Sequence, residues 1–291
     1  GKSPINDQNR GLVAALEREL ARNGPPLPVY WGNRNWHPLL ADTLREMAMN
    51  GVRRALAFVT SGYGSYSGCR QYLDDISRAR QEVGASAPTV DKLRLFYNHP
   101  GFLAAMVERV KQACDRLPPE SRAAAPLVYT AHSIPAAMAA ESPYVEQLRE
   151  ACRLVSAELG REDWTLVYQS RSGPPSQPWL EPDVNDYLRK LHASRGPREV
   201  IVVPIGFVSD HMEVLYDLDT AARGLCDELG LVMVRAGTAG VHPKFISMIG
   251  ELILERMDPQ VARRALGNLG PWHEFCPSEC CPPPARVQRK G

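Results

Sequence analysis

Short apolar and β-branched runs alternate along this chain with longer segments of helical period, and this rhythm restricts the fold more than any other feature. Strands that alternate with helices are typical of α/β proteins with parallel sheets. The helical period is clearest where Leu12, Leu16 and Leu20 repeat every fourth residue on one face. We therefore predict an α/β fold. The predicted strands are Leu27–Trp31, Arg54–Thr60, Lys92–Tyr97, Leu127–Thr130, Trp164–Tyr168, Val200–Ile205 and Leu231–Arg235, and the predicted helices are Asp7–Arg22, Leu39–Asn50, Arg70–Val83, Pro100–Arg116, Tyr144–Leu159, Val184–His192, Asp210–Leu229 and Pro243–Arg256.

A segment rich in proline and alanine, Pro118–Pro126, separates two halves of similar rhythm. This composition is typical of a linker between domains. We therefore predict a first domain over residues 1–117 and a second over residues 118–239. The sequence changes character after Met257, which indicates that residues 258–291 form a C-terminal tail.

Charge and hydropathy exclude some classes of partner. The 34 Lys and Arg residues balance 33 Asp and Glu residues, whereas nucleic-acid-binding proteins usually carry a basic excess. The longest apolar runs, such as Ile201–Val208, are far shorter than the roughly 20 residues of a membrane span. Since no secretory signal precedes the first predicted helix, we expect a soluble, cytoplasmic protein. The chain opens at Gly1 rather than at Met, and we expect its natural start to lie upstream.

Polar segments follow five of the predicted strands near their carboxyl ends. In open parallel sheets, ligands bind beyond these ends. Each segment alone is compatible with ordinary turn and capping chemistry. Together they predict one long cleft edge that is rich in Arg, Tyr, Trp, His and carboxylate side chains. The five segments are 32–36 (GNRNW), 61–67 (SGYGSYS), 131–133 (AHS), 169–173 (QSRSG) and 209–213 (SDHME).

His132 is the first candidate for chemistry at this edge. A single histidine after a strand is most often a hydrogen-bonded structural residue, and Pro135 would keep the loop rigid in either case. Imidazole is also the side chain best matched to proton transfer near neutral pH. The residues alone leave a structural and a catalytic role open.

Glu213 and Asp217 stand four residues apart in a predicted helix and so share one face. Asp210 and Glu213 also fit the capping-box pattern, in which they only satisfy backbone amides. Two stacked carboxylates without a basic partner repel each other unless a cation or proton lies between them. His211, near the helix start, would add affinity for iron. A metal-handling helix and a simple capping role both remain open.

Seven cysteines, an odd number, indicate reduced thiols or metal ligands rather than a disulfide framework. Cys276, Cys280 and Cys281 supply three thiols within six residues of the tail. Thiolates in such a group bind Zn²⁺ or an iron–sulfur cluster. A tail with free thiols is the alternative.

Four segments of the chain resemble the signature motifs of ferrochelatases. Their order and approximate spacing agree with that family, and the resemblance runs from Gly1 to Arg256. The pairing of the second segment with the fourth is its most specific element. The four segments are 29–38 (VYWGNRNWHP), 130–135 (TAHSIP), 168–184 (YQSRSGPPSQPWLEPDV) and 204–219 (PIGFVSDHMEVLYDLD).

The resemblance implies two Rossmann-like domains with parallel sheets and a porphyrin cleft between them, the helix at 240–257 returning to the first domain. Ferrochelatases normally begin with a strand and a Gly-rich loop ahead of the segment that matches residues 3–10. We therefore expect the N-terminal strand of the first domain to be absent from this chain. The implied activity is insertion of Fe²⁺ into a porphyrin during haem biosynthesis.

The tail and composition look most similar to the actinobacterial branch, which implies coproporphyrin III as the substrate. Protoporphyrin IX is the alternative substrate. A non-catalytic porphyrin or haem carrier of the same fold and a cobalt chelatase are alternative functions. As partners, the resemblance implies the porphyrin, Fe²⁺ and transient contacts with enzymes of the haem pathway, but no nucleic acid.

The resemblance also implies roles for single residues. His132 matches the family's proton acceptor and metal contact, and Glu213 matches the carboxylate that faces it. The remaining matches are Asp210, His211 and Asp217 as a supporting metal path, Ser3 and Tyr72 as porphyrin contacts, and Arg34 as the partner of a propionate.

Members of this branch carry a [2Fe–2S] cluster that takes one more cysteine from inside the chain. Cys114 is the predicted fourth ligand because it ends a helix of the first domain, where the tail should dock. The implied ligand set is Cys114, Cys276, Cys280 and Cys281, with Cys152 and then Cys69 as alternatives to Cys114.

Overall fold

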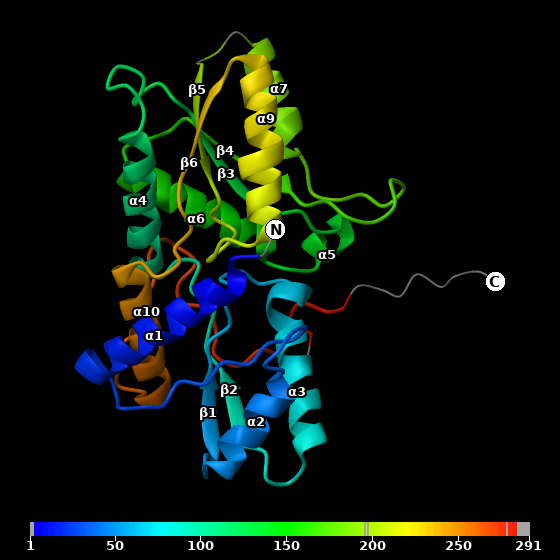
Figure 1. The fold of residues 1–291 in the computed structure, drawn as a ribbon, viewed down its shortest axis with the longest axis vertical. Coiled ribbons are helices and arrows are strands. Elements are labelled where there is room, and N and C mark those ends of the chain that lie inside the picture. Colours follow the sequence, from blue (N-terminus) through cyan, green and yellow to red (C-terminus); the bar gives the residue numbers. More distant parts are fainter. Residues whose placement is uncertain (1–2, 195, 197, 278, 284–291) are drawn as a thin grey trace, which may run out of the picture.

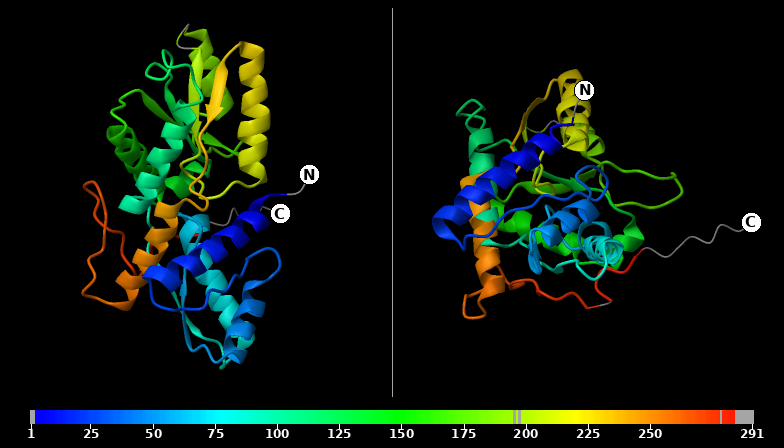
Figure 2. Two further views of the ribbon diagram at one scale, coloured as in Figure 1. Left: turned by 60° about the vertical axis from the view of Figure 1, so that its left-hand side comes forward. Right: turned by 60° about the horizontal axis from the view of Figure 1, so that its bottom comes forward.

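A computed structural model describes residues 3–194, 196, 198–277 and 279–283. It shows two lobes, each built around a parallel sheet (Figures 1 and 2). The predicted α/β class is therefore confirmed. The first lobe holds β1 (Arg54–Ala57) and β2 (Thr89–Lys92), and the second holds, in spatial order, β4 (Trp164–Gln169), β3 (Leu127–His132), β5 (Glu199–Val203) and β6 (Val232–Arg235).

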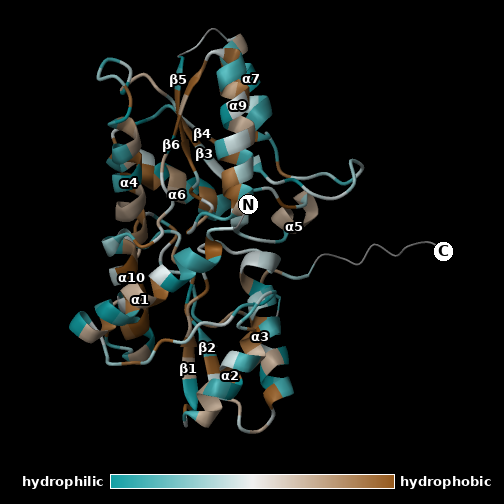
Figure 3. Ribbon diagram, in the orientation of Figure 1, coloured by the Kyte–Doolittle hydropathy of each residue, from teal (hydrophilic) through white to brown (hydrophobic). Residues whose placement is uncertain are grey.

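Helices cover both faces of the four-stranded sheet. On one face lie α4 (Pro100–Cys114) and α6 (Tyr144–Glu158), and on the other lie α7 (Val184–Ala193) and α9 (Arg223–Leu229) (Figure 1). Val200–Val203 are fully buried, as expected for a parallel strand that is covered on both sides. Figure 3 shows hydrophobic residues concentrated in the middle of this sheet. Because α4 already packs in the second lobe, the chain crosses between the lobes ahead of the predicted linker.

The first lobe and the junction between the lobes are also helical. α2 (Leu40–Met49) packs beside α3 (Gln71–Val83). α1 (Ile5–Asn23) buries Leu12, Leu16 and Leu20, as its period predicts, and packs on α10 (Pro243–Met257). Since α10 also packs on α4, it ties the two lobes together. The short α5 (Ala136–Ala140) follows β3.

Two predicted strands are wrong. Residues 25–32 lie outside any helix or strand of the described structure. Pro25, Pro26 and Pro28 remove backbone donors from this segment, which explains why the predicted strand Leu27–Trp31 forms no ladder. The second prediction, Lys92–Tyr97, starts where β2 ends. Its apolar side chains are buried in the main core without strand pairing.

The predicted helix Asp210–Leu229 is divided into three parts. A short α8 (Met212–Val214) leads into a π-helix, η2 (Leu215–Ala222), which continues as α9. A second π-turn, η1 (Tyr66–Arg70), precedes α3. π-helical turns are frequent at functional sites, and a period of 3.6 residues in the sequence does not predict them.

The tail returns across the molecule after α10 (Figure 2). Arg94 and Glu255 form an ion pair of 2.7 Å in which both side chains are 2% exposed, and Arg94 also donates to the Arg264 carbonyl at 2.8 Å. Asn98 donates to the Gly270 carbonyl at 2.8 Å. These contacts fix the start of the tail to the core. Within the described residues, no helix combines the length and the hydropathy that a membrane span requires.

A cavity of about 1420 Å³ lies between the lobes. Three of its polar lining residues, His132, His211 and Glu213, lie within hydrogen-bonding or near-contact distance of one another and define its polar end. Apolar side chains of α1, α2 and β1 also line the cavity. Among the described residues, β1 pairs with a strand along one edge only, that of β2. The polar end is the candidate site.

Candidate active site

His132 is the last residue of β3, and this strand positions its side chain. The strand is held rigidly because Leu127–Ala131 are fully buried, and its register sets His132 opposite Gln169 of β4. The His132 carbonyl accepts a hydrogen bond from the Tyr144 hydroxyl at 3.0 Å. The ring Nδ1 contacts the Ser133 carbonyl, which leaves Nε2 directed into the cavity. The imidazole is one third exposed, so it is within reach of a ligand.

Glu213 approaches from the start of α8. The segment after β5 packs closely on β3, since a Cβ on Gly206 would lie 2.6 Å from the Ala131 Cβ. The helix is capped by His211, whose Nδ1 accepts from the Glu213 amide at 3.2 Å. The capping role considered for Asp210 is therefore wrong. Its carboxylate pairs with Arg235 at 3.1 Å instead.

Three side chains converge at the polar end of the cavity. The Glu213 Oε2 lies 3.7 Å from the His132 Nε2 and 3.8 Å from the His211 Nδ1. His132 keeps a raised pKa because the Glu213 carboxylate and the Ser133 carbonyl outweigh the opposing effect of burial. Interaction with His132 lowers the pKa of Glu213. Burial lowers the pKa of His211, which favours a neutral imidazole able to bind a metal.

Asp217 supplies a second carboxylate, from η2, one turn along the chain from Glu213. Its Oδ2 accepts from the Ser170 hydroxyl and, at 3.3 Å, from the Gln169 Nε2. Gln169 also contacts the Glu213 carbonyl at 3.4 Å. Ser170 adopts a φ of 60°, a left-handed conformation that points to a positional requirement. The sequence indicated a cleft edge at 169–173, but the roles of Gln169 and Ser170 were missed.

The predicted metal path is therefore only partly assembled. His132, His211 and Glu213 are neighbours, and Asp217 lies behind them. Asp210 is engaged by Arg235, which also binds Asp219 at 2.7 Å. We propose that Asp210 orients this region through Arg235.

Two of the three predicted porphyrin contacts lie together in the first lobe. Arg34 and Tyr72 both line the cavity, and the guanidinium lies 4.4 Å from the centre of the Tyr72 ring. The Arg34 Nε pairs with Asp75 at 2.6 Å, and its Nη1 donates to the Ser67 carbonyl at 3.3 Å. These contacts hold the guanidinium in place. Ser3 lies at the start of α1, where its hydroxyl accepts from the Ile5 amide at 3.4 Å.

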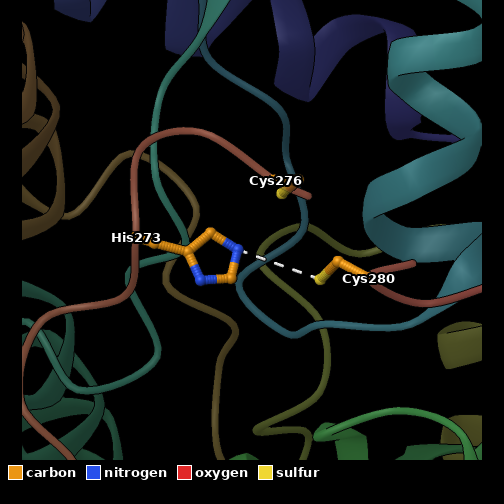
Figure 4. A group of neighbouring side chains, drawn as sticks. All are labelled: His273, Cys276 and Cys280. Atoms are coloured by element: carbon orange, nitrogen blue, oxygen red, sulfur yellow. Dashed lines mark hydrogen bonds between the residues drawn. The ribbon is translucent and has the colours of Figure 1, made fainter. Parts of the chain in front are cut away.

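A second cluster of reactive side chains forms where the tail meets η1. The His273, Cys276 and Cys280 ligand atoms all lie within 4.8 Å of one another, and Figure 4 shows the three side chains directed toward a common point. The Cys280 Sγ is 3.8 Å from the Cys281 Sγ. Interaction between Cys69 of η1 and Cys276 lowers the pKa of Cys276 and raises that of Cys69. The structure thus gathers four thiols and one imidazole.

The predicted fourth thiol is not part of this group. Cys114, at the end of α4, has Arg161, Asp115 and Arg122 as its charged neighbours, and burial raises its pKa. Cys152 is fully buried within α6. Cys69, the third candidate from the sequence, lies beside the tail thiols instead. The structure does not bring Cys114 to them because the tail docks beside η1, and the sequence did not reveal this π-turn.

Comparisons with known proteins match the chain to one family. Residues 1–257 match the family described as Ferrochelatase. A ferrochelatase of Rhodopirellula baltica is 54% identical over 97% of this chain and 80% of that protein. Coproporphyrin III ferrochelatases of Frankia alni and Nocardia farcinica are 49% and 48% identical, over 98% and 100% of this chain and over 75% and 86% of those proteins.

Solved structures show the same fold at low identity. SirB from Bacillus subtilis with Fe³⁺ has a TM-score of 0.64 at 13% identity, covering 90% of this chain and 95% of SirB. CbiX, the terminal enzyme for siroheme biosynthesis in denitrifying bacteria, has a TM-score of 0.56 at 15% identity, covering 89% of this chain and 96% of CbiX. The predicted chelatase-like architecture is therefore confirmed. With the family match extending over residues 1–257, the chain belongs to the ferrochelatase family.

Proposed function

We propose that this protein inserts Fe²⁺ into coproporphyrin III, releasing two protons from the pyrrole nitrogens. The observation that carries the proposal is the pairing of His132 with Glu213 at 3.7 Å in a cavity that Arg34 also lines. A planar macrocycle in this cavity would present its ring nitrogens to the imidazole and carboxylate, and a propionate to the guanidinium.

The pKa directions divide the chemical work between the two residues. A raised pKa makes the His132 imidazole the better proton acceptor, so it takes the pyrrole protons. A lowered pKa keeps Glu213 ionised, so its oxygens can replace water around the incoming Fe²⁺. His211 and Asp217 extend the same ligand types away from the ring. Neither imidazole nor carboxylate holds iron as firmly as a thiolate, which allows release into the porphyrin.

The pH dependence of the reaction tests this division. At low pH His132 is protonated and cannot accept a proton, so kcat/KM should fall as the pH drops through its raised pKa. In Glu213→Gln the carboxylate that raises this pKa is gone. The acidic limb of the pH profile should therefore move to lower pH, while the plateau falls because an iron ligand is lost. Profiles of kcat/KM for both proteins measure the shift.

Glu228→Gln, on the exposed surface of α9, is the matched control and should keep the parent profile. An acidic limb in Glu213→Gln that stays in place or moves to higher pH would contradict the assignment of His132 as the base.

The substrate is assigned from chemistry and from relatives. Coproporphyrin III carries a carboxylate on each pyrrole ring, whereas protoporphyrin IX has vinyl groups on two of them. Relatives at 46–49% identity are named coproporphyrin III ferrochelatases. In anaerobic Fe²⁺ insertion assays we expect kcat/KM for coproporphyrin III to exceed that for protoporphyrin IX. The reverse preference would overturn this assignment, and binding without insertion would identify a carrier.

We further propose that Cys69, Cys276, Cys280 and Cys281 hold a [2Fe–2S] cluster. The donor set fits, because such clusters take four thiolates and the structure gathers four thiols at one place. The bound cluster would supply one-electron chemistry and a cross-link between the tail and η1. All seven cysteines are free of disulfides, which supports a cytoplasmic location. The proposed partners are the porphyrin, Fe²⁺ and, transiently, other haem-pathway enzymes.

A further inference from the structure

Lys92, the last residue of β2, is a buried cation without a carboxylate partner among the described ion pairs. The residue is 7% exposed, and its Nζ donates a hydrogen bond to the Leu93 carbonyl at 3.1 Å. The neighbouring Asp91 is taken by Arg54 and Arg256. A buried ammonium without a counter-ion is strongly disfavoured, so the position of Lys92 requires an explanation.

The groups around Lys92 supply that explanation. Arg256 pairs with Asp91 of β2 and with Glu274 of the tail, so the end of β2 lies beside the tail. From this position the Lys92 charge acts on the thiols of Cys69, Cys276 and Cys281 and on His273. On the thiols, its charge favours the thiolate form. Lys92 thus faces the same set of side chains that the tail and η1 bring together. The cation lies on β2, whereas the thiols lie on η1 and the tail. The tertiary fold therefore brings these groups together.

Four thiolates carry more negative charge than a [2Fe–2S] core carries positive charge, and the group stays anionic when it is bound. The reduction potential of such a centre depends on its net charge, on hydrogen bonds to sulfur and on burial. A buried ammonium near the thiolates changes the net charge of this region.

We propose that Lys92 is the built-in counter-ion of this cysteine site, stabilising the thiolate-bound group and raising its reduction potential. The proposal rests on the proposed cluster. Adding an electron makes the site more negative, so a fixed positive charge favours the reduced form. Removing that charge should make the cluster harder to reduce.

Lys92→Met, which keeps the chain length and removes the charge, tests the proposal beside Lys92→Arg, which keeps the charge. A mediated redox titration of the purified protein, followed by visible absorption and by electron paramagnetic resonance, measures the midpoint potential. We expect Lys92→Met to shift the one-electron equilibrium about tenfold toward the oxidised form, which corresponds to 59 mV. Lys92→Arg and the exposed control Lys111→Met should stay near the parent value.

Other outcomes are equally informative. Cluster loss in Lys92→Met but not in Lys92→Arg supports the counter-ion role, whereas loss in both, or equal potentials in all proteins, overturns it. If the parent protein carries no cluster, the cofactor proposal fails, and Co²⁺ titration of the reduced protein tests Lys92 separately. The thiolate-to-cobalt absorption should then require about tenfold more Co²⁺ in Lys92→Met, and an unchanged titration would refute the counter-ion role.

Discussion

Replacing His132 by alanine is expected to lower kcat for Fe²⁺ insertion by about 10²- to 10⁴-fold, the usual contribution of a positioned general base. The substitution removes the Nε2 atom that lies 3.7 Å from Glu213 and leaves no other imidazole on β3. The fold should survive, since the side chain is one third exposed and the strand is held by its buried neighbours. Anaerobic loss of the free-porphyrin spectrum gives the rate.

His192→Ala is the matched control because His192 is exposed in the last turn of α7, away from the cavity. Porphyrin binding, measured by fluorescence quenching, should persist in His132→Ala. This separates a lost chemical step from a lost site. A kcat within a few-fold of the parent enzyme would exclude His132 as the proton acceptor.

Replacing Cys69 by alanine is expected to abolish the visible absorption of the proposed cluster. Cys69 is the thiol of η1 that meets Cys276 of the tail, and with three thiolates left the cluster lacks a ligand. Cys114→Ala should keep the spectrum, because Cys114 lies among Arg161 and Arg122 instead. Iron and sulfide content of anaerobically purified proteins gives an independent measurement.

The pair of variants distinguishes two ligand sets that differ in one residue. Loss in Cys114→Ala with retention in Cys69→Ala would restore the set predicted from the sequence. A parent protein without iron, sulfide or colour after anaerobic purification would refute the cluster itself.

The fold could be predicted where a local pattern determines the structure. Leu12, Leu16 and Leu20 give a helical face, and the buried run before His132 gives a parallel strand. The segment at Leu27–Trp31 looks equally apolar, but strand formation depends on a neighbour and on backbone donors, and prolines remove some of those donors. The π-helical turns also escaped prediction because they depend on tertiary packing rather than on a sequence period.

The site was predictable to the extent that its residues end strands or begin helices. His132 and Glu213 were identified in this way, and the structure brings them together. Gln169 and Ser170 were not identified, since their contacts with Glu213 and Asp217 depend on the register between β3 and β4 and on the path of η2. Cys69 was ranked third among the possible ligands because no local signal shows where a tail will dock.

The single turn of η1 contacts the cavity on one side and the tail on the other. Ser67 and Gly68 line the wall of the cavity, and the Ser67 carbonyl holds Arg34, whereas Cys69 of the same turn belongs to the thiol group and the Arg70 guanidinium reaches the Pro277 carbonyl. One short stretch of backbone is thus shared by the substrate wall and the tail. A thiol-specific reagent that modifies the tail cysteines would shift η1 and so displace Arg34, although the reagent does not enter the cavity. Equally, porphyrin that presses on this wall would alter how easily those thiols react.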